Sequence, residues 1–200
     1  RFNKQAGTSV FNVLQRVGAM VNATTWMDRT NYFELLPKAH LPLAMEIEAD
    51  RMRFARLSPE DVTSEKTVIL NEFDRGDNEP TQNLYQTVWS MAYLAHPYHH
   101  STIGWRSDIE QTTPEKLRAF YDTFYWPDNA TLSIIGDIDR EQALAWVHQY
   151  FGSLPKSTIP RPEVTIKEPQ QRGERRITVR KEAELGSVMI AFKNPEGLHT

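Results

Sequence analysis

The 200-residue sequence has no cysteine, little net charge and no long apolar run, and each absence excludes a class of protein. Without cysteine the chain can form neither a disulfide nor a thiolate metal site. Its formal net charge is -3 and no expected helix carries a stripe of Lys and Arg, so we expect no nucleic-acid partner. No apolar run approaches the roughly 20 residues that a membrane-spanning helix needs. Hydrophobic residues make up 40% and charged residues 24%, which predicts an ordinary packed core.

The spacing of apolar residues predicts a mixture of helices and strands. Helical spacing and helix-start signals predict helices at residues 6–17, 41–54, 59–74, 82–95, from 113–115 to before 127, and 141–151. Short apolar or alternating runs predict strands at residues 20–25, 30–36, 130–135, 176–180 and 187–192. The first two strands form a hairpin around Met27–Asp28. The fold class is therefore α+β, a mostly antiparallel sheet with helices packed on one face.

The distribution of proline predicts where one domain ends. Residues 1–157 carry the regular pattern of helices and strands, and we expect them to form the core of one domain. Residues 158–172 are rich in proline and predict a connecting loop. Residues 173–200 predict further strands that begin the next segment. Because the chain opens on Arg1 without a methionine, we expect it to be a piece of a longer protein.

Two glutamates on the expected helix 59–74 are the sharpest chemical signal. Glu65 and Glu72 are seven residues apart, which is about two turns or roughly 10 Å along one side. The helical wheel places both at the border of the apolar face of Val62, Ile69 and Phe73. A carboxylate at that border needs a cation, a metal or several donors, because desolvating an unpaired charge is costly. Spacing leaves two interpretations open: salt bridges to a neighbouring helix, or a metal ligand with a supporting carboxylate.

Several short motifs lie along nearly the whole chain in a specific order. They are Asn22-Ala23-Thr24, Glu48-Ala49-Asp50-Arg51-Met52, the segment from Glu65 to Glu72, His96-Pro97-Tyr98 and Gly136-Asp137. Their order and spacing resemble those of the insulinase/pitrilysin-type zinc peptidases, family M16. The resemblance implies a LuxS/MPP-like metallohydrolase fold and a zinc (Zn2+) cofactor.

The resemblance also assigns roles to particular residues. Family members hold zinc on a His-x-x-Glu-His motif and a distal glutamate. By position, Glu72 corresponds to that distal ligand, and Glu65 to a supporting glutamate of the catalytic site. Asn22, Ala23 and Thr24 correspond to the strand that binds substrate, on which a peptide adds as an extra strand. Without the resemblance, Asn22 is equally typical of a turn or a strand end.

One expected motif is missing, since none of the six histidines forms His-x-x-Glu-His. Two explanations remain open: the motif precedes residue 1 in the full protein, or the protein is a homologue without a catalytic site. The presence of both Glu65 and Glu72 favours the first explanation. His96, His99 and His100 lie close together, and we expect them to be loop residues rather than a second metal site.

The predicted function is that of a zinc-dependent metalloendopeptidase that cleaves peptides or unfolded polypeptides with a metal-activated water. These residues lack the His-x-x-Glu-His part of the site, so we expect them to be inactive alone. The expected partners are a polypeptide substrate and a second M16-like domain or subunit, and the periplasm is favoured over the cytoplasm. One alternative is a non-catalytic M16 homologue that binds peptides or supports an active subunit. Another is an unrelated α+β interaction domain whose two glutamates are salt-bridged.

Overall fold

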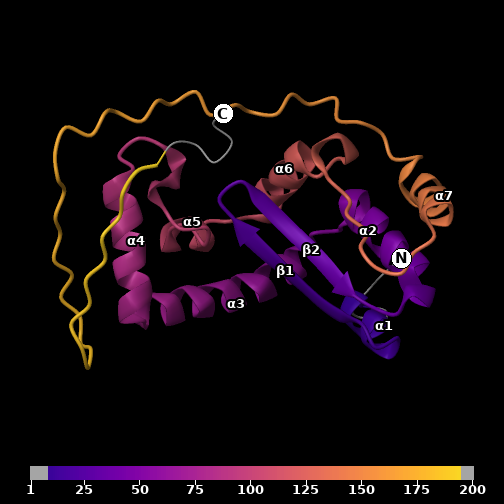
Figure 1. Cartoon of the computed structure of the whole chain (residues 1–200), viewed down its shortest axis with the longest axis horizontal. Helices are drawn as coiled ribbons and strands as arrows, with labels where there is room; N and C mark the ends of the chain where they lie inside the picture. The colour runs from indigo at the N-terminus through magenta and orange to yellow at the C-terminus, as the bar shows by residue number, and fades with distance from the viewer. Residues whose placement is uncertain (1–8, 195–200) are drawn as a thin grey trace. The chain divides into compact units, whose positions relative to one another are not determined.

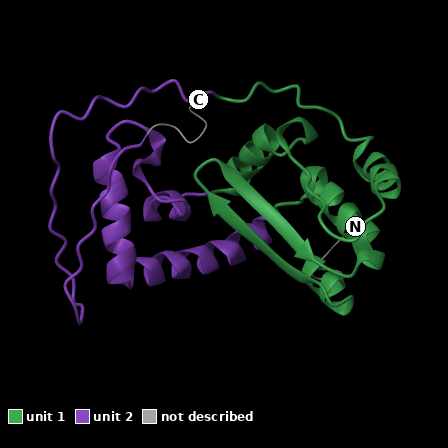
Figure 2. Ribbon diagram, viewed as in Figure 1, with its two compact units in different colours: residues 1–58, 113–162 green, residues 59–112, 163–200 purple. Residues whose placement is uncertain are grey.

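The computed structural model describes residues 9–194 (Figure 1). The chain forms two compact units, each built from two separate stretches of sequence (Figure 2). The first unit comprises residues 1–58 and 113–162, and the second comprises residues 59–112 and 163–200. Helices and an antiparallel pair of strands are both present, which confirms the α+β fold class.

The first unit begins with a short helix and a hairpin. Helix α1 (Val10–Arg16) is capped by the hydroxyl of Ser9, which accepts a hydrogen bond from the backbone of Asn12 at 3.2 Å. Gly18 follows with a φ of 74°, a left-handed conformation that turns the chain into the hairpin. Strands β1 (Met20–Trp26) and β2 (Arg29–Leu35) pair from Met20↔Leu35 to Trp26↔Arg29. The predicted hairpin and its short turn around Met27–Asp28 are confirmed.

Helices complete the first unit. They are η1 (Lys38–His40), α2 (Leu41–Phe54), α6 (Pro114–Phe124), η3 (Pro127–Asn129) and α7 (Arg140–Phe151). Side chains of Thr113 and Asp139 cap α6 and α7, which explains why these helices begin where they do. Helix α2 packs against α7, and its fully buried Ile47 lies at the centre of the core. The remaining buried residues of this core are Leu14, Ala44, Met45, Ala49, Tyr121 and Ala143.

The second unit is built on helices. Helix α3 (Pro59–Asn78) packs against α4 (Pro80–Ala92) and α5 (Arg106–Glu110), and the short η2 (Pro97–His99) follows α4. Helix α3 runs four residues past its predicted end because a helical glycine, Gly76, costs only about 1 kcal/mol. Helix α5 was not predicted.

Residues 163–194 form an irregular strap in the second unit, without helix or strand. Three of its charged side chains form hydrogen bonds with other residues of this unit. Lys181 donates to the carbonyl of Asp77, and Arg175 donates to the carbonyl of Met91 at the end of α4. The carboxylate of Glu168 accepts hydrogen bonds from the backbone amides of three consecutive residues, Leu94, Ala95 and His96, at 2.8, 2.9 and 3.0 Å.

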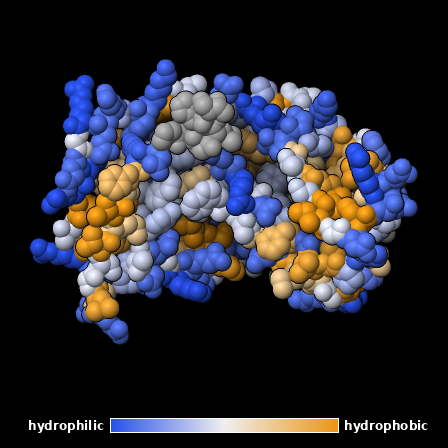
Figure 3. All heavy atoms as spheres, in the orientation of Figure 1, coloured by the Kyte–Doolittle hydropathy of each residue, from blue (hydrophilic) through white to orange (hydrophobic). Residues whose placement is uncertain are grey.

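Three predicted strands do not form in this chain. Residues 130–135, 176–180 and 187–192 pair with no other strand among residues 9–194, where the sheet is the β1–β2 hairpin. Their apolar side chains are exposed, as in Ile135 (95%) and Val188 (89%), and exposed apolar groups are visible on both units (Figure 3). The prediction was wrong because apolar alternation shows that a segment suits a sheet, but it does not supply the partner that a strand needs.

Candidate functional site

Helix α3 carries both glutamates singled out from the sequence. Val62 is buried, whereas Ile69 and Phe73 are half-buried, so the predicted apolar face exists. Glu65 and Glu72 lie on one side of the helix as expected, but both side chains are exposed. The expectation that this border position would desolvate them is wrong, because α3, whose buried residue is Val62, buries a narrow stripe where it packs against α4 and α5. Water can solvate both carboxylates, so burial does not force either to have a partner.

Other charged residues of α3 hold the helix in place. Lys66 donates a hydrogen bond to the carbonyl of Glu110 on α5 at 3.0 Å. Arg106, also on α5, forms ion pairs with Asp74 of α3 and with Glu110, the latter at 2.9 Å. Both carboxylates raise the pKa of Arg106, the hydrogen bond to Asp74 having the larger effect. These contacts orient α3 without using Glu65 or Glu72.

The salt bridges expected of a purely structural pair of glutamates are not formed. Within residues 9–194, neither Glu65 nor Glu72 has an ion pair. The two carboxylates are therefore available to a cation or ligand from outside this stretch. Their exposure and lack of partners are what a metal ligand and its neighbour require, although solvated surface glutamates share these properties.

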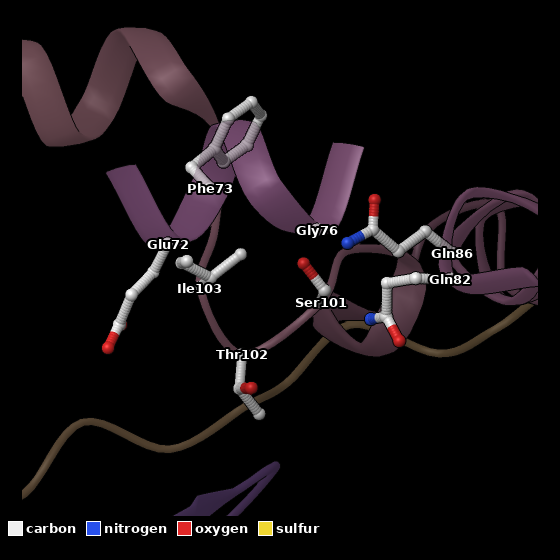
Figure 4. A pocket seen from close by; sticks show the side chains of 8 residues that line it. All are labelled: Glu72, Phe73, Gly76, Gln82, Gln86, Ser101, Thr102 and Ile103. Atoms are coloured by element: carbon white, nitrogen blue, oxygen red, sulfur yellow. The ribbon is translucent and has the colours of Figure 1, made fainter. Parts of the chain in front are cut away.

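Glu72 lines a pocket of about 150 Å³ in the second unit. The other lining residues come from α3, α4 and the loop before α5, and they are Phe73, Gly76, Gln82, Gln86, Ser101, Thr102 and Ile103. Figure 4 shows the amides of Gln82 and Gln86 close to Ser101 at one end, with the carboxylate of Glu72 directed away at the other. The polar end offers uncharged donors and acceptors. Sequence reasoning missed it, although the four-residue spacing of the glutamines places both on one face of α4.

Strand β1 contains the predicted substrate-binding residues. The loop between the paired residues Trp26 and Arg29 has two residues, and this geometry places the ladder hydrogen bonds at Trp26 and every second residue before it. The main-chain groups of Val21, Ala23 and Thr25 therefore face away from β2. In the described part of the chain no strand pairs with this edge of β1.

The predicted substrate residues also make local contacts. The side-chain oxygen of Asn22 accepts a hydrogen bond from the backbone amide of Ala23 at 2.8 Å. Thr24 accepts one from the guanidinium of Arg29 at 3.3 Å, across the hairpin. All three residues of the Asn22–Thr24 segment are exposed. The amide of Ala23 is thus held by its own neighbour, while its carbonyl and the main-chain groups of Val21 and Thr25 remain at the open edge.

The described residues do not complete a zinc site. Among residues 9–194, no three His, Asp or Glu side chains converge on a position that could hold a metal ion. Zinc in proteins takes about four ligands, and Glu72 could be one of them. The clustered histidines have other contacts: His96 accepts from the backbone of Tyr98 at 3.2 Å, and His99 and His100 lie against Trp105.

Within the described ranges, no helix is long and apolar enough to cross a bilayer.

Comparison with protein-family models gives two adjacent matches. Residues 3–104 match the model described as insulinase (peptidase family M16), and residues 111–199 match the model described as the peptidase M16 inactive domain. The first match covers the α3 glutamates and β1.

Individual proteins agree with the family models. The chain is 32% identical to the zinc protease PqqE of Helicobacter pylori over 192 residues, which is 94% of this chain and 43% of that protein. The crystal structure of a protease from Helicobacter pylori superposes with a TM-score of 0.76 at 30% identity, covering 80% of this chain and 39% of that one. The first half of the periplasmic protease PqqL from Escherichia coli gives a TM-score of 0.66 at 25% identity, covering 83% and 34%. The chain therefore spans less than half the length of these proteins.

Proposed function

Because the chain belongs to the insulinase family of peptidases, family M16, we propose that it is part of a zinc-dependent endopeptidase that holds an extended polypeptide along β1. The observation that carries this proposal is the open edge of β1. An extended peptide can pair there with the main-chain groups of Val21 and Thr25 and with the carbonyl of Ala23. Main-chain pairing does not depend on side chains, so varied sequences could bind.

Binding at this edge assigns a role to Asn22. By holding the amide of Ala23, its side chain fixes the backbone in the middle of the edge before a peptide arrives. A backbone that is already ordered loses less conformational entropy on binding. Asn22, Ala23 and Thr24 thus act together as the docking segment.

Glu72 supplies one oxygen ligand of the zinc ion, and Glu65 acts beside it as the supporting carboxylate of the catalytic site. Both carboxylates are exposed and without ion pairs in the described residues, so neither must break a salt bridge to take this role. The other ligands, including the His-x-x-Glu-His histidines, come from outside residues 9–194. Zinc, when bound by the complete site, supplies the activated water for peptide hydrolysis.

The complete protein includes more than this chain. A second M16-like domain or subunit would enclose the peptide, since the chain spans only 43% of its relative PqqE. The periplasm is the favoured compartment because the similar protease PqqL is described as periplasmic.

A second candidate function is that of a non-catalytic peptide-binding or scaffold subunit. The match of residues 111–199 to the inactive domain of the family favours it. The same open edge would then bind peptides without cleaving them. The residues encoded immediately before Arg1 discriminate the two, because His-x-x-Glu-His there favours the peptidase.

The decisive experiment measures peptidase activity and zinc content of the full-length protein with Glu72→Gln, Glu65→Gln and the control Glu60→Gln. Glu60 is exposed on the same helix but lies in its first turn. We expect Glu72→Gln to lose zinc and at least about 100-fold in activity, and Glu65→Gln to lose about 10- to 100-fold with zinc retained. Glu60→Gln should match the wild type. Full zinc content and activity in Glu72→Gln would overturn the ligand assignment.

A further inference from the structure

A largely buried polar network in the first unit joins β2 to α2 and to the residue that follows α6. The guanidinium carbon of Arg51, on α2, lies 4.0 Å from the centre of the Tyr32 ring of β2. The same guanidinium forms ion pairs with Glu34 of β2 at 3.2 Å and with Glu48 of α2. The Tyr32 and Tyr125 hydroxyls are hydrogen-bonded at 2.6 Å. Tyr32 thus links β2 to α2 through Arg51 and to the residue after α6 through its hydroxyl.

Forming this network between β2 and α2 costs free energy, because it removes charged groups from water. Burial lowers the pKa of Arg51 and raises that of Glu34, which means that desolvation acts against both charged forms. The Nε of Arg51 is buried without a hydrogen-bond partner among the described residues. Well-packed apolar side chains commonly stabilise such a contact equally well or better. The network therefore contributes a defined geometry more than free energy of folding.

The residues that the network positions are paired with the open edge of β1, which is the proposed docking edge for a peptide. Tyr32 is the cross-strand partner of Ala23, and Glu34 is the partner of Val21. Arg51 therefore contacts the two residues of β2 that pair with Val21 and Ala23. The main-chain groups of Val21 and Ala23 face the open edge of β1. A shift of β2 against α2 would therefore move this edge as well, because β1 is paired with β2.

We propose that Arg51 is a positioning residue that sets the place of the peptide-docking edge by clamping Tyr32 and Glu34 of β2 onto α2. Arg51 does not itself contact the peptide. The inference rests on the proposed function where it concerns peptide binding, but the clamp itself can be tested without any activity.

Arg53 provides a matched control on the same helix. Its guanidinium carbon lies 3.5 Å from the ring centre of Trp126, and it pairs with Asp122 at 3.1 Å and with the carbonyl of Tyr125 at 2.7 Å. Like Arg51, it is a largely buried arginine stacked on an aromatic ring. Its partners lie in and after α6, however, and none belongs to the hairpin. Loss of Arg53 should weaken the core without displacing β2 from α2.

The first experiment compares hydrogen exchange of Arg51→Met, Arg53→Met and the wild type in this chain. We expect amides of residues 20–35 to exchange about tenfold faster in Arg51→Met, while those of α6 and α7 change less. Arg53→Met should show the reverse distribution. Equal acceleration over both regions in Arg51→Met would overturn the proposal. If Arg51→Met does not fold, Tyr125→Phe, which removes one hydroxyl of the network, must still accelerate exchange preferentially at Asn22 and Phe33, the ladder-bonded pair beside Tyr32.

The second experiment measures kcat and KM of the full-length protein with the same variants. Arg51→Met should raise KM about tenfold with kcat nearly unchanged, because only the binding edge is displaced. Arg51→Lys should recover little, since an ammonium cannot stack and pair as a guanidinium does. A proportional fall in kcat for both Arg51→Met and Arg53→Met would identify a merely structural role. A full-length protein without peptidase activity would refute the proposed function, and the exchange experiment would still decide the role of Arg51.

Discussion

The hydroxyl of Tyr121 replaces a helical hydrogen bond at the end of α2. It donates to the carbonyl of Arg51 at 2.8 Å and accepts from the amide of Ala55 at 3.2 Å. These two groups are four residues apart and would otherwise bond to each other in a longer helix. Tyr121 is only 5% exposed, and this burial raises its pKa. Tyr121→Phe therefore removes one buried oxygen and keeps the ring.

The expected loss of stability follows from the two bonds. Each contributes about 0.5–1.5 kcal/mol, and a buried group left without a partner costs about 1–3 kcal/mol. The freed groups of Arg51 and Ala55 can recover part of this by bonding directly to each other, as groups four residues apart do in a helix. We therefore expect Tyr121→Phe to lower the free energy of unfolding by about 1–2 kcal/mol.

Urea unfolding followed by circular dichroism measures this loss. The slope of free energy against urea should stay constant while the midpoint falls. Tyr85→Phe is the matched control, since the contact of Tyr85 that the structure shows is with the ring of Trp89 at 6.1 Å, which phenylalanine keeps. A loss below about 0.5 kcal/mol in Tyr121→Phe, the range of ordinary surface substitutions, would refute the reasoning.

Three further predictions concern the core, the strap and the hairpin. Ile47→Ala should destabilise the first unit by about 2–5 kcal/mol in urea unfolding, because Ile47 is fully buried and a cavity would remain. Partial desolvation favours the neutral acid of Glu168, but its three backbone amide donors outweigh this and lower its pKa to about 2. The stabilisation by the ionised Glu168 carboxylate is then complete above the ordinary glutamate pKa of about 4.3 and is lost as the pH falls through 2. A carboxyl carbon of Glu168 that titrates near pH 4.3 in NMR would contradict this. Gly18→Ala should cost about 1–2 kcal/mol of stability, because Gly18 has a φ of 74°.

Local patterns were enough to predict several elements of this protein. The bounds of α2, Leu41–Phe54, agree with the prediction, as do the hairpin around Met27–Asp28 and the start of α6 after Thr113. Each depends on residues within a few positions of one another, such as a capping hydroxyl or a two-residue turn. The order of short motifs likewise identified the family that the family models then matched.

Long-range contacts decided the rest. The segments 130–135 and 187–192 have the composition of strands but no partner strand among residues 9–194, and the exposure of Glu72 follows from how little of α3 is covered. The contact of Arg51 with β2 and the hydrogen bonds of Glu168 to residues more than 70 positions away left no local pattern. Whether a charged side chain has a partner, or an apolar segment has a strand to pair with, depends on which neighbour the folded chain brings to it. A short window of residues does not contain that neighbour.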